Sequence, residues 1–320
     1  MKIDALFKRF FGNPSVFADV CNLAFHGGNP VVKPEDLVEM PTEESAVLGD
    51  GSAALALHRR RDLLMAWCPG GGPPRLLIGF EVQSLPDRTL AVSVPMYDFL
   101  GYEAQLQAME ASVRGAGATP MERLGAGKRL VSMGTLVIYV GTEPWLEDVS
   151  LEAIADMPGG GWKRAVVSPR PLVLRLNMLS ARRVAGLQKP LQCLVASLRN
   201  ARFGRARLKE IIRDKSLFED VPLPAVRLIS ALLKMKIKID SRKETVNMCQ
   251  AVREMMEEER NIGCRRGLSR GRKEGAKEER QKNIKMTVAA MKENNAPDSS
   301  IVSFLGKVFG LTARAARAFL

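Results

Sequence analysis

The stretch "LLIGFEVQ", residues 76–83, is an apolar run of strand length that carries two polar side chains. Its length and its apolar residues predict a buried β-strand. Glu81 lies inside the run and Gln83 follows two positions later, so both point to the same face of the strand. A buried carboxylate without a partner is costly, and such a group usually becomes neutral, pairs with a cation or binds a metal. The chemistry of this strand therefore depends on what accompanies Glu81.

The preceding segment, "AALALHRRRDLLMAW" at residues 53–67, is a second predicted strand. The sequence "CPGGGPP" between the two strands is a strong turn signal, so they are expected to form a hairpin that turns near residues 68–74. Such a hairpin brings Asp62 close to Glu81 if the register permits. Two carboxylates about 4 Å apart repel by about 4 kcal/mol at an effective dielectric constant near 20. The pair would therefore share a proton or hold a cation.

The two carboxylates and the backbone carbonyl of Val82 would form an oxygen site suited to Mg²⁺ or Mn²⁺. A metal of this kind activates water and neutralises charge on a phosphate, which is the chemistry of phosphodiester hydrolysis. Gln83 could orient the water or contact the phosphate. The alternative interpretation is an ordinary salt bridge, in which Asp62 or Glu81 pairs with Arg60, Arg61 or Arg75.

The rest of the chain predicts an α/β core followed by an all-helical region. Two short helices are expected over residues 3–25, broken at "GNPS" with Ser15 as the N-cap. A helix is expected over 94–113, a third strand over 129–141, and an edge strand near "RAVVSPRPLVL", whose prolines limit pairing. The predicted domains are a core at 1–175, a helical region at 176–245, and a charged helix with a C-terminal helical hairpin at 246–320. Within the helical part, "LLKMKIKID" and "ETVNMCQAVREMMEEERNIGCRRG" are predicted to be the clearest helices.

The composition limits the classes of partner and of catalytic site that the chain can have. The chain has 48 Lys and Arg against 35 Asp and Glu, a net charge of +13 that favours a polyanionic partner. Five scattered cysteines argue against a disulfide framework or a zinc ribbon, and only two histidines are present, so carboxylates would carry any catalysis. We expect a cytoplasmic protein, because no stretch is apolar enough to span a bilayer and the N-terminus lacks a signal-peptide core.

Several blocks of the sequence, in order, resemble one known family. They are "NPSVFADVCNLAFHGG", "VVKPEDL", "RRRDLL", "LLIGFEVQS", "VPMYDFLGYEAQL", "LVIYVGTEPW" and "KIKIDSRKETVNMCQAVREMMEEERNIG". The family is that of bacterial recombination-promoting nucleases, transposase-like proteins of the PD-(D/E)XK nuclease superfamily. The resemblance runs along nearly the whole chain. It implies a restriction-endonuclease-like core, in which helices flank a central mixed sheet, and a Mg²⁺-dependent DNA endonuclease.

The resemblance also assigns roles to individual residues. Asp62 matches the first metal carboxylate and Glu81 the second, while Gln83 stands where the wider superfamily has Lys. On the helix that follows, positions i, i+4 and i+7 share one face, and the resemblance implies that this face looks toward the site; its residues are Asp98, Tyr102 and Gln105.

The sequence also departs from the family pattern. Val82 replaces the usual Asn and Phe80 the usual Ile, and residues 84–95 lack the Met-Pro-x-Arg pattern. A catalytically inactive DNA-binding or assembly protein that keeps the nuclease fold is therefore the alternative function. RNA in place of DNA as substrate, and assembly into a homo-oligomer, also stay open.

Two further motifs favour structural explanations. "GAGATPMERLGAGKRL" at residues 115–130 does not satisfy the phosphate-loop pattern and is expected to be a loop. The C-terminal "FLGKVFGLTARAARAFL" is expected to form two short helices that meet at Phe309-Gly310, with Thr312 as the second N-cap. It could be half of a DNA-binding helix-turn-helix, but a helical hairpin that docks on its own chain is the favoured interpretation.

Overall fold

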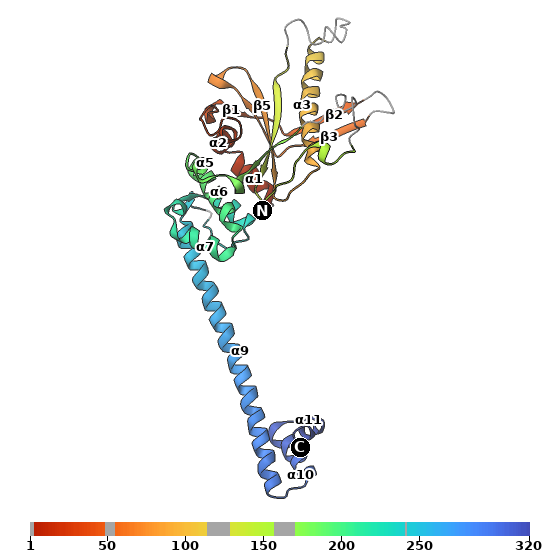
Figure 1. Ribbon diagram of the computed structural model, residues 1–320, viewed down its shortest axis with the longest axis vertical. Helices are drawn as coiled ribbons and strands as arrows, with labels where there is room; N and C mark the ends of the chain where they lie inside the picture. The colour runs from red at the N-terminus through yellow and green to blue at the C-terminus, as the bar shows by residue number, and fades with distance from the viewer. Residues whose placement is uncertain (1–2, 49–54, 114–128, 157–169, 241) are drawn as a thin grey trace. The chain divides into compact units, whose positions relative to one another are not determined.

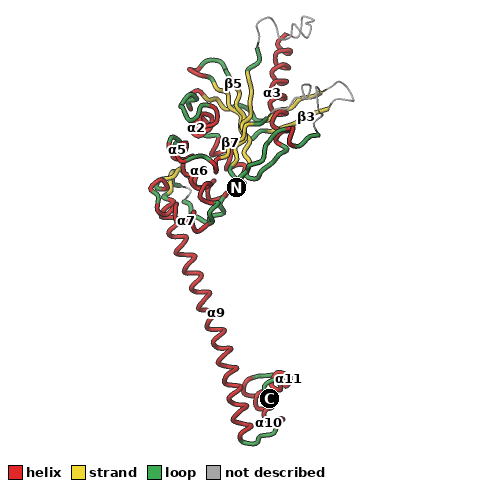
Figure 2. Tube along the Cα trace, viewed as in Figure 1, coloured by secondary structure: helices red, strands yellow, loops and turns green. Residues whose placement is uncertain are grey.

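A computed structural model describes residues 3–48, 55–113, 129–156, 170–240 and 242–320 of the chain (Figures 1 and 2). The N-terminal part contains a five-stranded mixed sheet in the order β1-β4-β5-β6-β7. Its strands are β1 (Leu37–Glu39), β4 (Leu63–Trp67), β5 (Leu76–Gln83), β6 (Ser132–Tyr139) and β7 (Leu172–Arg175). The predicted α/β class with a central mixed sheet is confirmed.

The hairpin predicted around "CPGGGPP" is the centre of this sheet. Strands β4 and β5 are antiparallel with Leu63 opposite Phe80, and the short 3-10 turn η3 (Pro69–Gly71) lies between them. Strand β6 then pairs parallel to β5, and helix α3 (Leu90–Val113) provides the crossover between the two strands. β7 pairs only with residues 136–139 of β6, as expected for an edge strand preceded by prolines.

Helices cover both faces of the sheet. On one face, Phe17 of α2 (Pro14–Phe25) stacks on Phe80 of β5, with ring centroids 3.8 Å apart. On the other face, Leu90 and Val94 of α3 belong to the same buried cluster as Val137 of β6. Because side chains alternate along a strand, Glu81 and Gln83 point away from α2 and toward the face that α3 covers.

The segment 53–67 forms two strands where one was predicted. β3 (Leu55–Arg60) pairs with β2 (Glu43–Leu48) in a separate two-stranded sheet, and the chain bends at Arg61 and Asp62 before β4 begins. The apolar pattern runs through both strands, so it does not reveal the change of sheet. The bend places Asp62 at the end of β4 rather than within it.

Two other local predictions are wrong. The N-cap of α2 is Asn13 and not Ser15, because the Asn13 side chain accepts from the backbone N–H groups of Ser15 and Val16 and Pro14 takes the first helical position. The "LLKMKIKID" segment is not helical beyond Leu232, where helix α8 (Leu223–Leu232) ends. Lys234 adopts a left-handed backbone with φ of 51°, and the residues after it alternate with the period of two that does not suit a helix.

The remaining elements of the N-terminal part pack beside the sheet. Helix α1 (Ile3–Phe11) contacts α8, and α6 contacts α2, so the helices after β7 share a core with the first two. These later elements are α5 (Ala181–Ala185), α6 (Lys189–Ala201), α7 (Arg205–Asp214) and the two-residue strands β8 (Val221–Pro222) and β9 (Thr245–Val246).

The chain divides into two compact units, Met1–Arg253 and Glu254–Leu320. The predicted domain boundaries near 175 and 245 stay predictions. The 46-residue helix α9 (Met248–Glu293) begins in the first unit, and its last turns pack with α10 (Asp298–Phe309) and α11 (Ala313–Arg317) around Ile284, Ile301 and Leu305. The two predicted C-terminal helices are confirmed. Gly310 has φ of 63°, and the Thr312 hydroxyl accepts from the Ala315 N–H as the N-cap.

None of the helices in the described ranges has the length and apolar content that crossing a bilayer requires. The glycine-rich segment 115–127, predicted to be a loop, lies outside the described residues.

Candidate metal-binding site

The β4–β5 register brings Asp62 beside β5. Leu63 pairs with Phe80 and Leu64 with Gly79, so the next position along this register sets Asp62 opposite Glu81. Because β4 starts only at Leu63, the backbone does not continue the ladder there. The Asp62 carboxylate replaces a backbone carbonyl as the hydrogen-bond acceptor for β5, and its Oδ2 accepts the Val82 N–H at 2.9 Å.

The Glu81 carboxyl group is half-buried, and it is close enough to Asp62 for the two charges to interact. The pKa of Glu81 is raised from 4.5 to about 7, chiefly by burial and to a smaller extent by the negative charge of Asp62. A hydrogen bond from Gln83 Nε2 to Glu81 Oε1, 3.2 Å long, and the positive charge of Arg61 both lower this pKa, but by less. Near neutral pH Glu81 therefore keeps a proton that an ordinary carboxyl group would have released, or a cation takes the place of that proton.

Arg61, which the sequence offered only as a possible salt-bridge partner of Asp62 or Glu81, is a further member of the site. Its side chain is 1% exposed, and its Nη2 lies 3.4 Å from Asp98 Oδ1 and 3.2 Å from Met133 Sδ. It crosses the sheet directly over Gly79, where a Cβ atom would lie 2.9 Å from Arg61 Cδ and 2.7 Å from Thr135 Oγ1. A glycine inside an apolar strand is the one sequence signal for such a close approach.

This geometry bears on the salt-bridge alternative. Arg61 forms an ion pair with Asp98 on α3, and Asp62 accepts a hydrogen bond from the β5 backbone, while a salt bridge between Asp62 and a neighbouring arginine stays a prediction. The charge of Arg61 nevertheless reaches Glu81, since it lowers the pKa of that carboxyl group. The guanidinium therefore compensates part of the negative charge at the site, and the net effect on Glu81 is still a raised pKa.

The α3 residues share one face, as their spacing predicts, and this face lies along β6. Tyr102 Oη accepts the Met133 N–H at 2.9 Å, and the Gln105 amide exchanges hydrogen bonds of 2.8 and 3.1 Å with the backbone of Val131. Asp98 bonds the hydroxyl of Thr135 at 2.7 Å and its N–H at 3.3 Å. The three side chains thus pair with alternate residues, from Val131 just before β6 to Thr135, where β7 does not reach.

The structure accordingly divides the predicted residues into two groups. Asp62, Glu81 and Gln83 lie together at the end of the β4–β5 hairpin. Asp98 joins them through Arg61, while the hydrogen bonds of Tyr102 and Gln105 go to β6.

The donor set fits a hard divalent cation that keeps several waters. Among the residues described, no group of three or more His, Cys, Asp or Glu side chains is arranged to hold a metal. Mg²⁺ often binds through only one or two protein carboxylates and completes its shell with water. Since the N–H and C=O of a strand residue point to the same neighbour, the Val82 carbonyl faces the side on which Asp62 lies. The two carboxylates of Asp62 and Glu81 and this carbonyl could therefore act together as ligands of one divalent cation.

Comparison with known proteins found no match for the chain among family models, curated proteins or solved structures.

Proposed function

We propose that the chain is a Mg²⁺-dependent DNA endonuclease that promotes recombination, with Asp62 and Glu81 as its metal ligands. The observation that carries the proposal is the paired placement of two carboxyl groups, one of which has its pKa raised to about 7 by burial and by the other. Such a pair is unstable as two free anions and is relieved by a divalent cation. Perturbed carboxyl groups of this kind are typical of functional sites.

The residues of the chain would have distinct roles. Asp62, Glu81 and the Val82 carbonyl would hold the cation, which when bound polarises the phosphate and makes water a better nucleophile near neutral pH. Gln83 donates to Glu81 Oε1 through its Nε2, so its own amide oxygen can accept a hydrogen bond from the attacking water and orient it. Arg61, which forms an ion pair with Asp98, provides a positive charge next to Gly79 of β5 but is not a metal ligand.

Two features of the sequence support a nucleic acid as the substrate: the net charge of the chain and its resemblance to recombination-promoting nucleases. A net charge of +13 suits a phosphate backbone, and the resemblance to recombination-promoting nucleases specifies DNA. The same charge would suit RNA, so the substrate is decided by assay. Mn²⁺ would replace Mg²⁺ at a site of carboxylate, carbonyl and water.

A second candidate function is a catalytically inactive DNA-binding or assembly protein. Gln83 favours it, because an uncharged amide cannot stabilise the developing charge on phosphate as a lysine does. Metal binding separates the two candidates. Titration with Mn²⁺ at pH 7.5 should raise the melting temperature of a protein with an intact metal site, and Asp62→Asn should abolish that rise.

The experiment that tests the proposal is nicking of supercoiled plasmid with Mg²⁺ or Mn²⁺. We expect wild type and Glu39→Ala, which removes an exposed carboxylate from β1 of the same sheet, to nick equally. Asp62→Ala and Glu81→Ala should each lose at least about 100-fold in rate, because either change leaves a single carboxylate ligand. A single-stranded RNA of matching length tests the alternative substrate.

The variants also show which outcomes of the nicking assay would contradict the proposal. Equal nicking by all four proteins would assign the activity to a contaminant or to another site and contradict the proposal. Silence of wild type on plasmid, linear DNA and RNA, combined with tight binding that weakens with salt, would favour the inactive DNA-binding candidate.

A further inference from the structure

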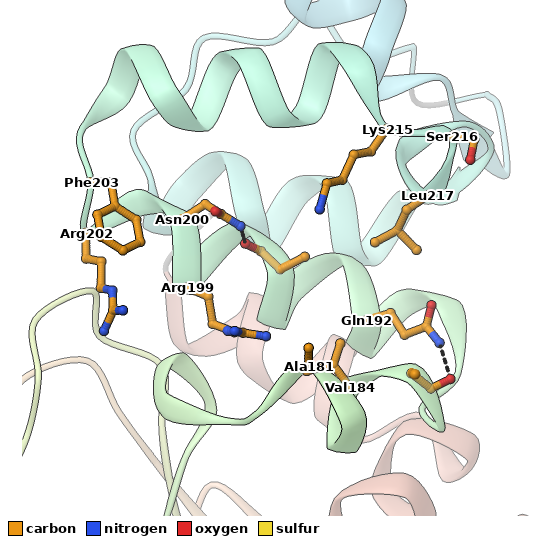
Figure 3. A pocket seen from close by; sticks show the side chains of 12 residues that line it. Ala181, Val184, Gln192, Arg199, Asn200, Arg202, Phe203, Lys215, Ser216 and Leu217 are labelled. Atoms are coloured by element: carbon orange, nitrogen blue, oxygen red, sulfur yellow. Dashed lines mark hydrogen bonds between the residues drawn. The ribbon is translucent and has the colours of Figure 1, made fainter.

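A cavity of about 730 Å³ lies in the first unit, among α5, α6 and the 3-10 turn η7 (Ser216–Phe218) (Figure 3). Its volume is in the range of cavities that hold small-molecule ligands. The residues that carry the metal-site proposal are not among those that line it. This cavity is therefore a second place to look for a ligand.

The charged side chains of the cavity all have one sign. Arg199, Arg202 and Lys215 line it, and none of the 12 lining residues that the structure describes is acidic. In Figure 3, Lys215 points from the η7 side toward α6, and the Arg199 guanidinium extends toward Ala181. Cations that line one hollow repel one another, and an anion between them would relieve that repulsion.

The surrounding chain strengthens the positive potential. Residues 181–215 contain ten Lys and Arg against two Asp and Glu, so much of the net charge of +13 is concentrated in this segment. Among these ten, Arg207 is engaged by Glu210 at 3.2 Å and Arg183 by the Leu23 carbonyl. Neither of these two residues lines the cavity. The cations aimed into the hollow are thus part of a wider basic surface and not isolated charges.

The rim adds an aromatic platform. Phe203 lines the cavity although the residue is 62% exposed, and the Arg202 guanidinium lies 4.6 Å from the centroid of its ring. An exposed aromatic ring with an arginine stacked on it offers two flat surfaces on which a nucleobase can stack. An anion alone would need only the cations, so Phe203 indicates a ligand with a flat apolar part as well.

Two amides complete the lining. Gln192 Nε2 donates to the carbonyls of Ala185 and Leu187 at 3.1 and 2.6 Å, and Asn200 Nδ2 donates to the Ala196 carbonyl at 2.7 Å. These bonds use the amide nitrogens and orient both side chains. The amide oxygens are therefore the atoms that can accept hydrogen bonds from the amino or imino groups of a base.

From these features we propose that the cavity binds a nucleotide unit, either free or within a single strand of nucleic acid, with its phosphate between Arg199 and Lys215 and its base on Phe203. This site goes beyond the proposed endonuclease centre and does not depend on the metal. A strand held here would place a polymer substrate on the same unit that carries Asp62 and Glu81.

The test is fluorescence anisotropy with a short labelled oligothymidylate. It uses the full chain carrying Glu81→Gln, in EDTA, so that binding is measured whether or not the protein is a nuclease. We expect Arg199→Gln and Lys215→Gln each to reduce the salt dependence of log Kd by about 0.7, the value for one phosphate contact on a single strand. Phe203→Ala should weaken binding by about fivefold or more through lost stacking.

Arg205→Gln is the matched control, because Arg205 is exposed in the same basic segment but does not line the cavity. It should leave both affinity and salt dependence nearly unchanged. An equal loss in Arg205→Gln would overturn the proposal in favour of diffuse surface charge. Should Arg199→Gln lower the melting temperature, the exposed Lys215 carries the test by itself.

Competition identifies the source of the nucleotide. Displacement of the probe by thymidine monophosphate supports a free nucleotide, and displacement only by unlabelled oligothymidylate supports a strand. If inorganic phosphate competes as well as thymidine monophosphate and Phe203→Ala has no effect, the cavity binds anions without a base, and the nucleotide assignment is wrong. No binding of any probe would also overturn it.

Discussion

Three side chains on one face of the sheet determine the chemistry of the β4–β5 hairpin. Asp62 caps the ladder through the Val82 N–H, Glu81 lies opposite it, and Arg61 crosses over Gly79 to reach α3. Each of these placements has a cost, in charge repulsion or in close contact. A single substitution at each position should therefore change the stability of the protein by a measurable amount.

Glu81 should make the stability of the protein depend on pH. Its pKa in the folded state is about 7 against an ordinary value of 4.5, so the folded protein binds more protons than the unfolded chain between these values. The free energy of unfolding should therefore fall by up to about 3 kcal/mol as the pH rises from 4.5 to above 7 without divalent metal. Urea unfolding across this range, in EDTA, measures it.

Glu81→Gln should remove that pH dependence, because the amide does not titrate, whereas Glu39→Gln should keep it. Added Mg²⁺ should restore the stability of wild type above pH 7 and leave Glu81→Gln unchanged. A wild-type stability that is flat between pH 4.5 and 8 would contradict the environment that we describe for Glu81.

Gly79 should not tolerate a side chain. In Gly79→Ala the new methyl group would lie 2.7 Å from Thr135 Oγ1 and 2.9 Å from Arg61 Cδ, which forces Arg61 from its path. Crowding of this kind costs about 1–3 kcal/mol. Gly134→Ala, on the neighbouring strand with no atom within 4 Å of the added Cβ, is the control and should be nearly neutral. Equal denaturation midpoints for the two variants would show that Arg61 does not pass over Gly79.

At the scale of elements, helix α3 acts as a partner for the open edge of β6. β7 pairs with β6 only from Leu136 onward, and the preceding backbone groups are satisfied by Tyr102, Gln105 and Asp98. Spacing at i, i+4 and i+7 predicts that these three share a face. Their hydrogen bonds reach every second residue from Val131 to Thr135, because alternate residues of an extended chain present their backbone groups to the same side.

Gln105→Ala should therefore weaken the sheet edge. The change leaves the Val131 N–H and C=O without their amide partner, at a cost of about 1–2 kcal/mol. Gln107→Ala is the control, since Gln107 is exposed on the same helix and bonds only Glu103 among the contacts described. Hydrogen exchange should be faster at Val131 in the first variant alone. Unchanged exchange there would mean that water replaces the amide at no cost.

At the scale of the whole molecule, the second unit includes a stretch of α9 whose described side chains are exposed and belong to no buried cluster. Residues 257–283 are all exposed, and four glycines recur at every fourth position from Gly263 to Gly275. Each glycine costs a helix about 1 kcal/mol relative to alanine. Local opening should therefore be easier here than in the first unit or in the cluster that the last turns of α9 form with α10 and α11.

Limited trypsin digestion should cut this stretch first, at the exposed Arg265, Arg266 or Arg272. The N-terminal fragment should keep the thermal transition of the first unit, because the sheet and its helices lie before Arg253. Gly267→Ala with Gly271→Ala should slow the cut several-fold by stabilising the helix. First cuts within 63–83 would mean that the sheet is less stable than α9.

The sequence alone determined the order and type of the central elements and the carboxylates on them. Turn chemistry at "CPGGGPP", alternation in "LLIGFEVQ" and Thr312 capping act between neighbours in the chain, so they can be predicted from local pattern. The split at Arg61 and Asp62, the path of Arg61 over Gly79 and the pairing of α3 with β6 were decided only by tertiary structure. They depend on contacts between groups 20 to 37 residues apart, such as Asp62 with Val82 and Asp98 with Thr135. Local periodicity carries no information about such contacts, because they are settled by how the elements pack.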